Sequence, residues 1–153
     1  TAFGVSYSFS TTLSGQAGNS ASFWGQTFTI PSGQSGTLNS ITNIPLTCYS
    51  SSQQTTARVR IYSSPSKTTL LATAISDFQL PSCTSGFSAT TNFTANFSNL
   101  NVNQGTQYFL ELERLTGSGN FYFSQNFSNP YSGGYSYRNG NVDTATDLVL
   151  PSI

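Results

Sequence analysis

The sequence predicts an all-β fold, an antiparallel β-sandwich of jelly-roll type with about eight or nine short strands and one disulfide. Apolar side chains recur at a spacing of two residues, and the period of a helix is almost absent. Gly, Pro, Asn or Ser interrupts this alternation about every ten residues, as turns do. With 153 residues, no internal repeat and no linker, the chain is expected to form a single domain, residues 1–153.

The first predicted strands alternate most clearly. In Phe3-Val5-Tyr7-Phe9 the large side chains lie on one face, and Gly and Ser lie on the other. Trp24-Gln26-Phe28-Ile30 repeats the pattern and is expected to end at Pro31-Ser32-Gly33. The third strand runs from Leu38 to Ile44 and is expected to end at Pro45.

In the next strand, Ala57-Val59-Ile61 forms the apolar face, so Arg58 and Arg60 are expected to face solvent. Residues tolerant of positive φ, Asn103-Gln104-Gly105 and Gly117 to Asn120, supply tight links further along the chain. The remaining predicted strands are Leu70 to Ile75 with Phe78, the segment of Phe93 and Phe97 continued by Leu100 and Val102, Tyr108 to Leu115, Asn120 to Ser124, and Asp147 to Leu150.

The composition combines many aromatic residues, 14%, with few charged ones, 7%. Disordered chains lack aromatic residues, so this chain is expected to fold. Its formal net charge is zero, and no basic cluster exceeds the pair Arg58 and Arg60. Phosphate backbones and anionic lipids require a concentrated positive field, so we expect no nucleic-acid partner. No apolar run reaches the length of about 20 residues that spans a bilayer, so no membrane insertion is expected.

The two cysteines, Cys48 and Cys83, lie in Thr-, Ser- and Pro-containing stretches typical of loops, and their spacing fits neither a metal nor a redox motif. We expect a disulfide closing a loop of about 35 residues, which contributes roughly 3–4 kcal/mol in the chain-entropy model. The alternative is two unrelated buried thiols. A disulfide indicates a secreted, extracellular protein, and the possible N-glycosylation sites Asn92, Asn96 and Asn126 point the same way.

Catalysis finds little support, because the chain contains no His and so no general base of near-neutral pKa for nucleophilic mechanisms. Glu111 and Glu113 lie two apart on one strand face and could form the carboxylate pair of a small glycosidase. Catalytic pairs usually face each other across a cleft, whereas adjacent glutamates within one strand are typical of a solvated face. We therefore predict a protein that is not an enzyme.

A Gly-rich segment near the end, residues 129–141, holds the densest group of ligand-binding residue types. Tyrosine rings stack on the apolar faces of sugars, while Arg and Asn satisfy sugar hydroxyls. The candidate ligand-binding residues are Tyr131, Tyr135, Tyr137, Arg138, Asn139 and Asn141, together with Trp24. The alternatives are a structural Gly corner for this segment and burial in the core for Trp24.

Two aspartates form a candidate metal site. Asp143 and Asp147 could join backbone carbonyls around a structural Ca²⁺, which accepts such mixed oxygen ligands. The sequence indicates no other cofactor.

Three motifs follow one another along the chain. They are Phe28-Thr29-Ile30-Pro31 with Gly36 to Ile41, then Gly105 to Leu112, and then Pro130-Tyr131-Ser132-Gly133-Gly134 with Asp147-Leu148. In these the chain resembles lectin-like, carbohydrate-binding jelly-roll modules of secreted microbial surface proteins and polysaccharide-degrading enzymes. The resemblance implies a module that holds a parent protein on polysaccharide or cell-surface glycan. The Ser- and Gln-rich insertions around Cys48 depart from that pattern.

A second function remains open. The chain could be a structural subunit of an extracellular filament or adhesin that assembles with copies of itself by β-strand addition through the segment Ala2 to Phe9.

Overall fold

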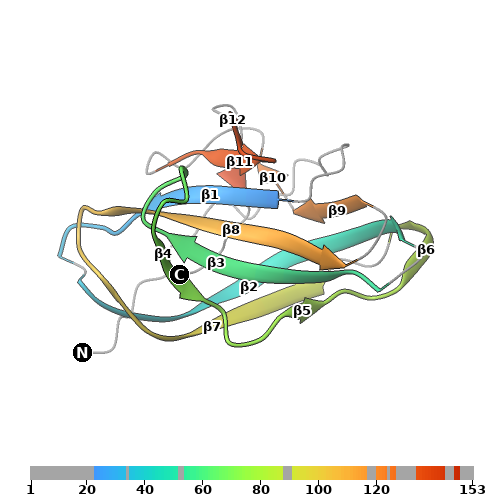
Figure 1. Ribbon diagram of the computed structural model, residues 1–153, viewed down its shortest axis with the longest axis horizontal. Helices are drawn as coiled ribbons and strands as arrows, with labels where there is room; N and C mark the ends of the chain where they lie inside the picture. Colours follow the sequence, from blue (N-terminus) through green and yellow to red (C-terminus); the bar gives the residue numbers. More distant parts are fainter. Residues whose placement is uncertain are drawn as a thin grey trace.

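The computed structural model describes residues 23–33, 35–51, 54–87, 91–116, 120–123, 125–126, 134–143 and 147–148. Every regular element among them is a β-strand and none is a helix, which confirms the all-β prediction (Figure 1). The strands are β1 (Phe23–Thr29), β2 (Gly36–Ser51), β3 (Thr56–Tyr62), β4 (Leu70–Thr73), β5 (Phe78–Gln79), β6 (Cys83–Phe87), β7 (Thr91–Val102), β8 (Gln107–Thr116), β9 (Asn120–Phe123), β10 (Gln125–Asn126), β11 (Ser136–Arg138), β12 (Asn141–Asp143) and β13 (Asp147–Leu148).

The strands form three antiparallel sheets. A seven-stranded sheet has the order β12-β11-β1-β8-β3-β4, with β5 also paired to β3, and a four-stranded sheet has the order β6-β2-β7, with β9 also paired to β2. Strands β10 and β13 pair separately. In Figure 1 strands β1, β8 and β3 lie in front of β2 and β7.

One hydrophobic core takes side chains from both larger sheets. Strand β3 shows the expected alternation, with Ala57, Val59 and Ile61 buried and the residues between them partly exposed. The core residues of the seven-stranded sheet include Trp24, Phe28, Val59, Ile61, Leu110 and Leu112, and those of the four-stranded sheet include Ile41, Ile44, Leu46, Ala95 and Phe97.

The expected end of a strand at Pro45 is wrong, because β2 continues through this proline to Ser51. The pairing of β2 with β7 shifts register between Ile41 and Ile44, directly before the proline. Proline lacks an N–H group for the ladder, and such irregular positions tolerate it within a sheet.

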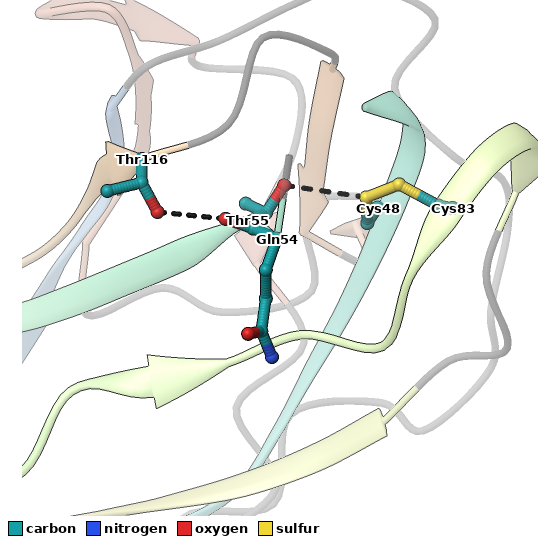
Figure 2. The surroundings of a disulfide bond; sticks show 5 residues. All are labelled: Cys48, Gln54, Thr55, Cys83 and Thr116. Carbon is teal, nitrogen blue, oxygen red and sulfur yellow. Dashed lines mark hydrogen bonds between the residues drawn. A yellow bond between two sulfur atoms is a disulfide. The ribbon is translucent and has the colours of Figure 1, made fainter. Parts of the chain in front are cut away.

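The disulfide between Cys48 and Cys83 is present, with the two Cα atoms 5.8 Å apart. The expectation that both cysteines lie in loops is wrong: Cys48 lies inside β2 and Cys83 begins β6, so the bond links paired strands of the four-stranded sheet. Figure 2 shows the Thr55 hydroxyl 3.5 Å from the Cys48 sulfur. Thr55 immediately precedes β3, so the disulfide lies where the chain passes from one sheet to the other.

The connection around the disulfide is also fixed from the seven-stranded sheet. The hydroxyl of Thr116, the last residue of β8, donates to the Gln54 carbonyl at 2.9 Å (Figure 2). It also lies 2.7 Å from the Thr56 hydroxyl on β3.

Among the described residues, no helix is long and apolar enough to cross a membrane. The predicted strand Phe3 to Phe9 and the predicted turn from Gly117 lie outside the described residues.

Candidate functional site

The outer face of the seven-stranded sheet, the face turned away from the core, gathers aromatic and charged side chains. Residues directly opposite each other in an antiparallel pair point to the same side. Gly25 on β1 is opposite Tyr137 on β11 and Glu111 on β8, and Glu111 is in turn opposite Arg60 on β3. Thr73 on β4 is opposite Arg60 as well. Side chains from five strands, β11, β1, β8, β3 and β4, therefore share this face.

Three rings form the aromatic group of this face, namely Tyr62, Phe109 and Tyr137. Phe109 lies between the other two, with its centroid 6.4 Å from that of Tyr62 and 5.1 Å from that of Tyr137, the latter in an edge-on arrangement. The Phe109 ring covers Gly25, because a Cβ atom there would overlap Cζ and Cε2 of the ring. The absence of a side chain at Gly25 thus allows the ring to lie across β1.

Tyr135 extends the aromatic group toward the sheet edge. Its backbone is fixed on β1, since the Thr27 N–H donates to the Tyr135 carbonyl at 2.9 Å and the Tyr135 N–H donates to the Thr27 hydroxyl at 2.7 Å. The residue is 46% exposed. Tyr137, two residues later, is partly buried, and burial is the main reason that its pKa is raised. The two tyrosines thus offer one exposed and one half-buried ring on the same face.

Asn139 and Gly140 form the two-residue turn between β11 and β12, where Arg138 is opposite Asn141. Both turn residues have positive φ, 49° and 83°, as a type I′ hairpin turn requires. The Asn139 side-chain oxygen accepts from the Phe23 N–H at 3.3 Å, and the Asn139 N–H donates to the Phe23 carbonyl at 3.0 Å. The Asn139-Gly140 dipeptide is a typical sequence signal for such a hairpin. Residues 129–141 were interpreted only as a Gly-rich segment, so this hairpin was not predicted.

Three ion pairs cross the same face, and we call them the ion-pair row: Arg58–Asp77, Arg60–Glu113 and Lys67–Glu111. Arg58 donates through Nε and Nη2 to the two carboxylate oxygens of Asp77 at 2.8 and 3.0 Å. The hydrogen bond from Arg58 lowers the pKa of Asp77. The arginines do lie on the outer face, as expected, but each binds a carboxylate.

Glu111 was expected on a solvated strand face, and this is wrong, since only 4% of the residue is exposed. Burial raises its pKa, while the hydrogen bond and the charge of Lys67 act in the opposite direction. The Lys67 nitrogen lies 3.0 Å from a Glu111 oxygen and 4.8 Å from the centroid of the Phe23 ring. Lysine covers Glu111 because the loop from β3 to β4 folds back toward β1, as Figure 1 shows.

Lys67 holds its place through an unusual backbone. Its φ is 56°, in the left-handed region that only a few residues other than glycine adopt. The Lys67 N–H donates to the Ser64 carbonyl at 3.0 Å, and the Ser63 N–H donates to the Thr69 carbonyl at 3.0 Å. These bonds close the loop on itself and direct the lysine across the sheet.

The structure brings some predicted ligand residues together and separates others. Tyr135, Tyr137 and Asn139 lie near one edge of the outer face. Asn141 is exposed on β12, but its pairing with Arg138, which is opposite Trp24, places it on the other side of the sheet. Trp24 does not join them, because it is fully buried in the core opposite Leu112 and cannot stack on a ligand.

Several predictions fall outside what the structure describes. Tyr131 is not among the described residues. For Arg138, Asp143 and Asp147 the structure describes the backbone, which lies in strands, but not the side chains. The calcium prediction is therefore untested, and the described residues contain no group of three or more His, Cys, Asp or Glu residues that could hold a metal.

The possible glycosylation sites lie on the two other sheets. Asn92 and Asn96 are exposed on β7 of the four-stranded sheet, whereas the side chain of Asn126, on β10, is not described.

Comparison with models of known protein families gave no match, and a search of curated proteins gave none either.

Proposed function

We propose that this chain is a non-catalytic carbohydrate-binding module that holds a glycan on the outer face of its seven-stranded sheet. The single observation that carries the proposal is the exposed Tyr135 on the same sheet face as the aromatic group and the ion-pair row. Sugar rings present apolar C–H faces to aromatic side chains and hydroxyls to polar ones. Both kinds of partner lie on this face.

A catalytic role for the glutamates is less well supported. Glu113 is bound to Arg60 and Glu111 is bound to Lys67 beneath the β3–β4 loop. A general acid or base must reach the proton that it transfers, and a buried, ion-paired Glu111 supports a structural role instead.

The proposal includes a fold of jelly-roll type and a secreted or cell-surface location, as in the modules that the sequence resembles. The disulfide and the exposed asparagines of β7 support an extracellular setting. The Ala2 to Phe9 segment needed for assembly by strand addition lies outside the described residues, so no observation favours the filament alternative.

The proposal is tested by affinity electrophoresis of the oxidised full chain in gels that contain soluble polysaccharides. Tyr135→Ala keeps the backbone bonds to Thr27 and removes the exposed ring. Loss of a stacking contact of about 1–1.5 kcal/mol predicts an affinity about five- to tenfold lower.

Ile75→Ala is the matched control, because Ile75 is an exposed apolar residue, 66% exposed, next to β7. We expect its affinity to equal that of the wild type. Two results would contradict the proposal. Either all three proteins have equal affinity for every polysaccharide that retains them, or no polysaccharide retains the wild type.

A further inference from the structure

We infer that the glycan held on this face is an uncharged polysaccharide, recognised by ion pairs that offer donors and acceptors side by side. The inference rests on the proposed function and specifies the ligand class of the same site. It follows from the charge balance of the face, from the hydrogen-bonding groups that its pairs leave open, and from the cost of separating them.

The ion-pair row is balanced. It contains three cations and three carboxylates, and each cation lies against one carboxylate. A ligand with carboxylate or sulfate groups is attracted by a concentrated positive potential. The opposite charges of each pair largely cancel, so the ion-pair row gives an acidic chain no such attraction.

The pairs nevertheless keep hydrogen-bonding capacity that suits hydroxyl groups. A guanidinium has five N–H donors, and Arg58 uses only Nε and Nη2 for Asp77. A carboxylate offers about four acceptor positions, more than one arginine fills. A sugar hydroxyl donates and accepts at once, so it can bridge a guanidinium and its carboxylate without breaking the pair.

An acidic ligand could gain a full ion pair on this face only by displacing a protein carboxylate from its cation. This displacement is least favourable at Lys67, because the Glu111 side chain is only 5% exposed and could not regain water. A buried carboxylate that loses its partner is strongly destabilising. The exposed pair Arg58–Asp77, with both side chains 35% exposed, can be opened by substitution without that cost.

The test compares retention of the oxidised full chain by uncharged polymers (xyloglucan, mannan, hydroxyethylcellulose) and by acidic ones (polygalacturonate, dextran sulfate). We expect the wild type to bind at least one uncharged polymer and neither acidic one. The affinity should change less than about twofold between roughly 0.01 M and 1 M salt, where the screening length falls from about 30 Å to about 3 Å.

Asp77→Asn releases Arg58 from its ion pair. The variant should therefore be retained by the acidic polymers at low salt, and high salt should abolish this retention. Arg58→Gln combined with Asp77→Asn is the matched control and should bind neither acidic polymer. Salt-sensitive binding of the wild type to the acidic polymers, tighter than to any uncharged one, overturns the inference alone. Retention by no polymer of either kind refutes the proposed function, and the inference fails with it.

Discussion

Gly25→Ala should disturb the aromatic group more than its small size suggests. The new Cβ would overlap the Phe109 ring, which is only 3% exposed and lies between Tyr62 and Tyr137. Overpacking of this kind costs about 1–3 kcal/mol, whereas alanine in a strand is better than glycine by about 0.5–1 kcal/mol. The net loss is therefore up to about 2.5 kcal/mol, which lowers the Tm of a domain of this size by up to about 10 °C.

A double-mutant cycle isolates the cause. In a Phe109→Leu background the obstructing ring is gone, so Gly25→Ala should become neutral or stabilise by up to about 1 kcal/mol. Urea unfolding with the disulfide intact measures all four free energies. Gly134→Ala is the control, because its Cβ would meet the Thr27 backbone rather than the ring, and Phe109→Leu should not relieve its cost. An equal cost of Gly25→Ala in both backgrounds would refute the role of Phe109.

The remaining predictions concern the hairpin, the disulfide and Glu111. Asn139→Ala should cost about 1–2 kcal/mol in thermal unfolding because of its positive φ, and Asn139→Gly clearly less; equal losses would exclude a backbone cause. Replacing Cys48 and Cys83 by Ala should lower the free energy of unfolding by roughly 3–4 kcal/mol, and excess thiol should leave this variant unchanged while destabilising the wild type. A burial-raised pKa of Glu111 means that the folded chain binds this proton more tightly than the unfolded chain does. Wild-type stability relative to Glu111→Gln should therefore fall as pH rises from 4.5, the ordinary pKa, to the raised pKa; a rise over that window would contradict it.

Local patterns in the sequence predicted the all-β class and the buried faces of single strands, but not every strand. About eight or nine strands were expected, whereas the described residues form thirteen, and β6, β11 and β12 were not among those expected. The two-residue period of Ala57-Val59-Ile61 predicted which side of β3 is buried, because alternation is a property of the extended chain itself. The same reasoning placed the strand end at Pro45 and the cysteines in loops, and both were wrong. Pairing of β2 with its neighbours outweighed those local preferences.

The tyrosines of the candidate site were predictable as a group, but their surroundings were not. Tyr135, Tyr137 and Asn139 are near one another in sequence, so their composition alone indicated a ligand role. Their neighbour Phe109 comes from β8, and only the register of β1 with β8 places its ring over Gly25. Trp24 shows the reverse case, since its aromatic character fitted a ligand role equally well until the fold buried it.

The sequence by itself determined that the chain is built of strands, because strands follow from local periodicity. It also determined that the chain has no His for catalysis and only two cysteines to pair, because these facts follow from the residue composition. Only the tertiary structure decided which charges meet. Arg60 and Glu113 are 53 residues apart, and Lys67 reaches Glu111 from a loop with a positive φ. Contacts between distant segments depend on strand register and loop geometry, which many sequences with the same alternation could satisfy differently.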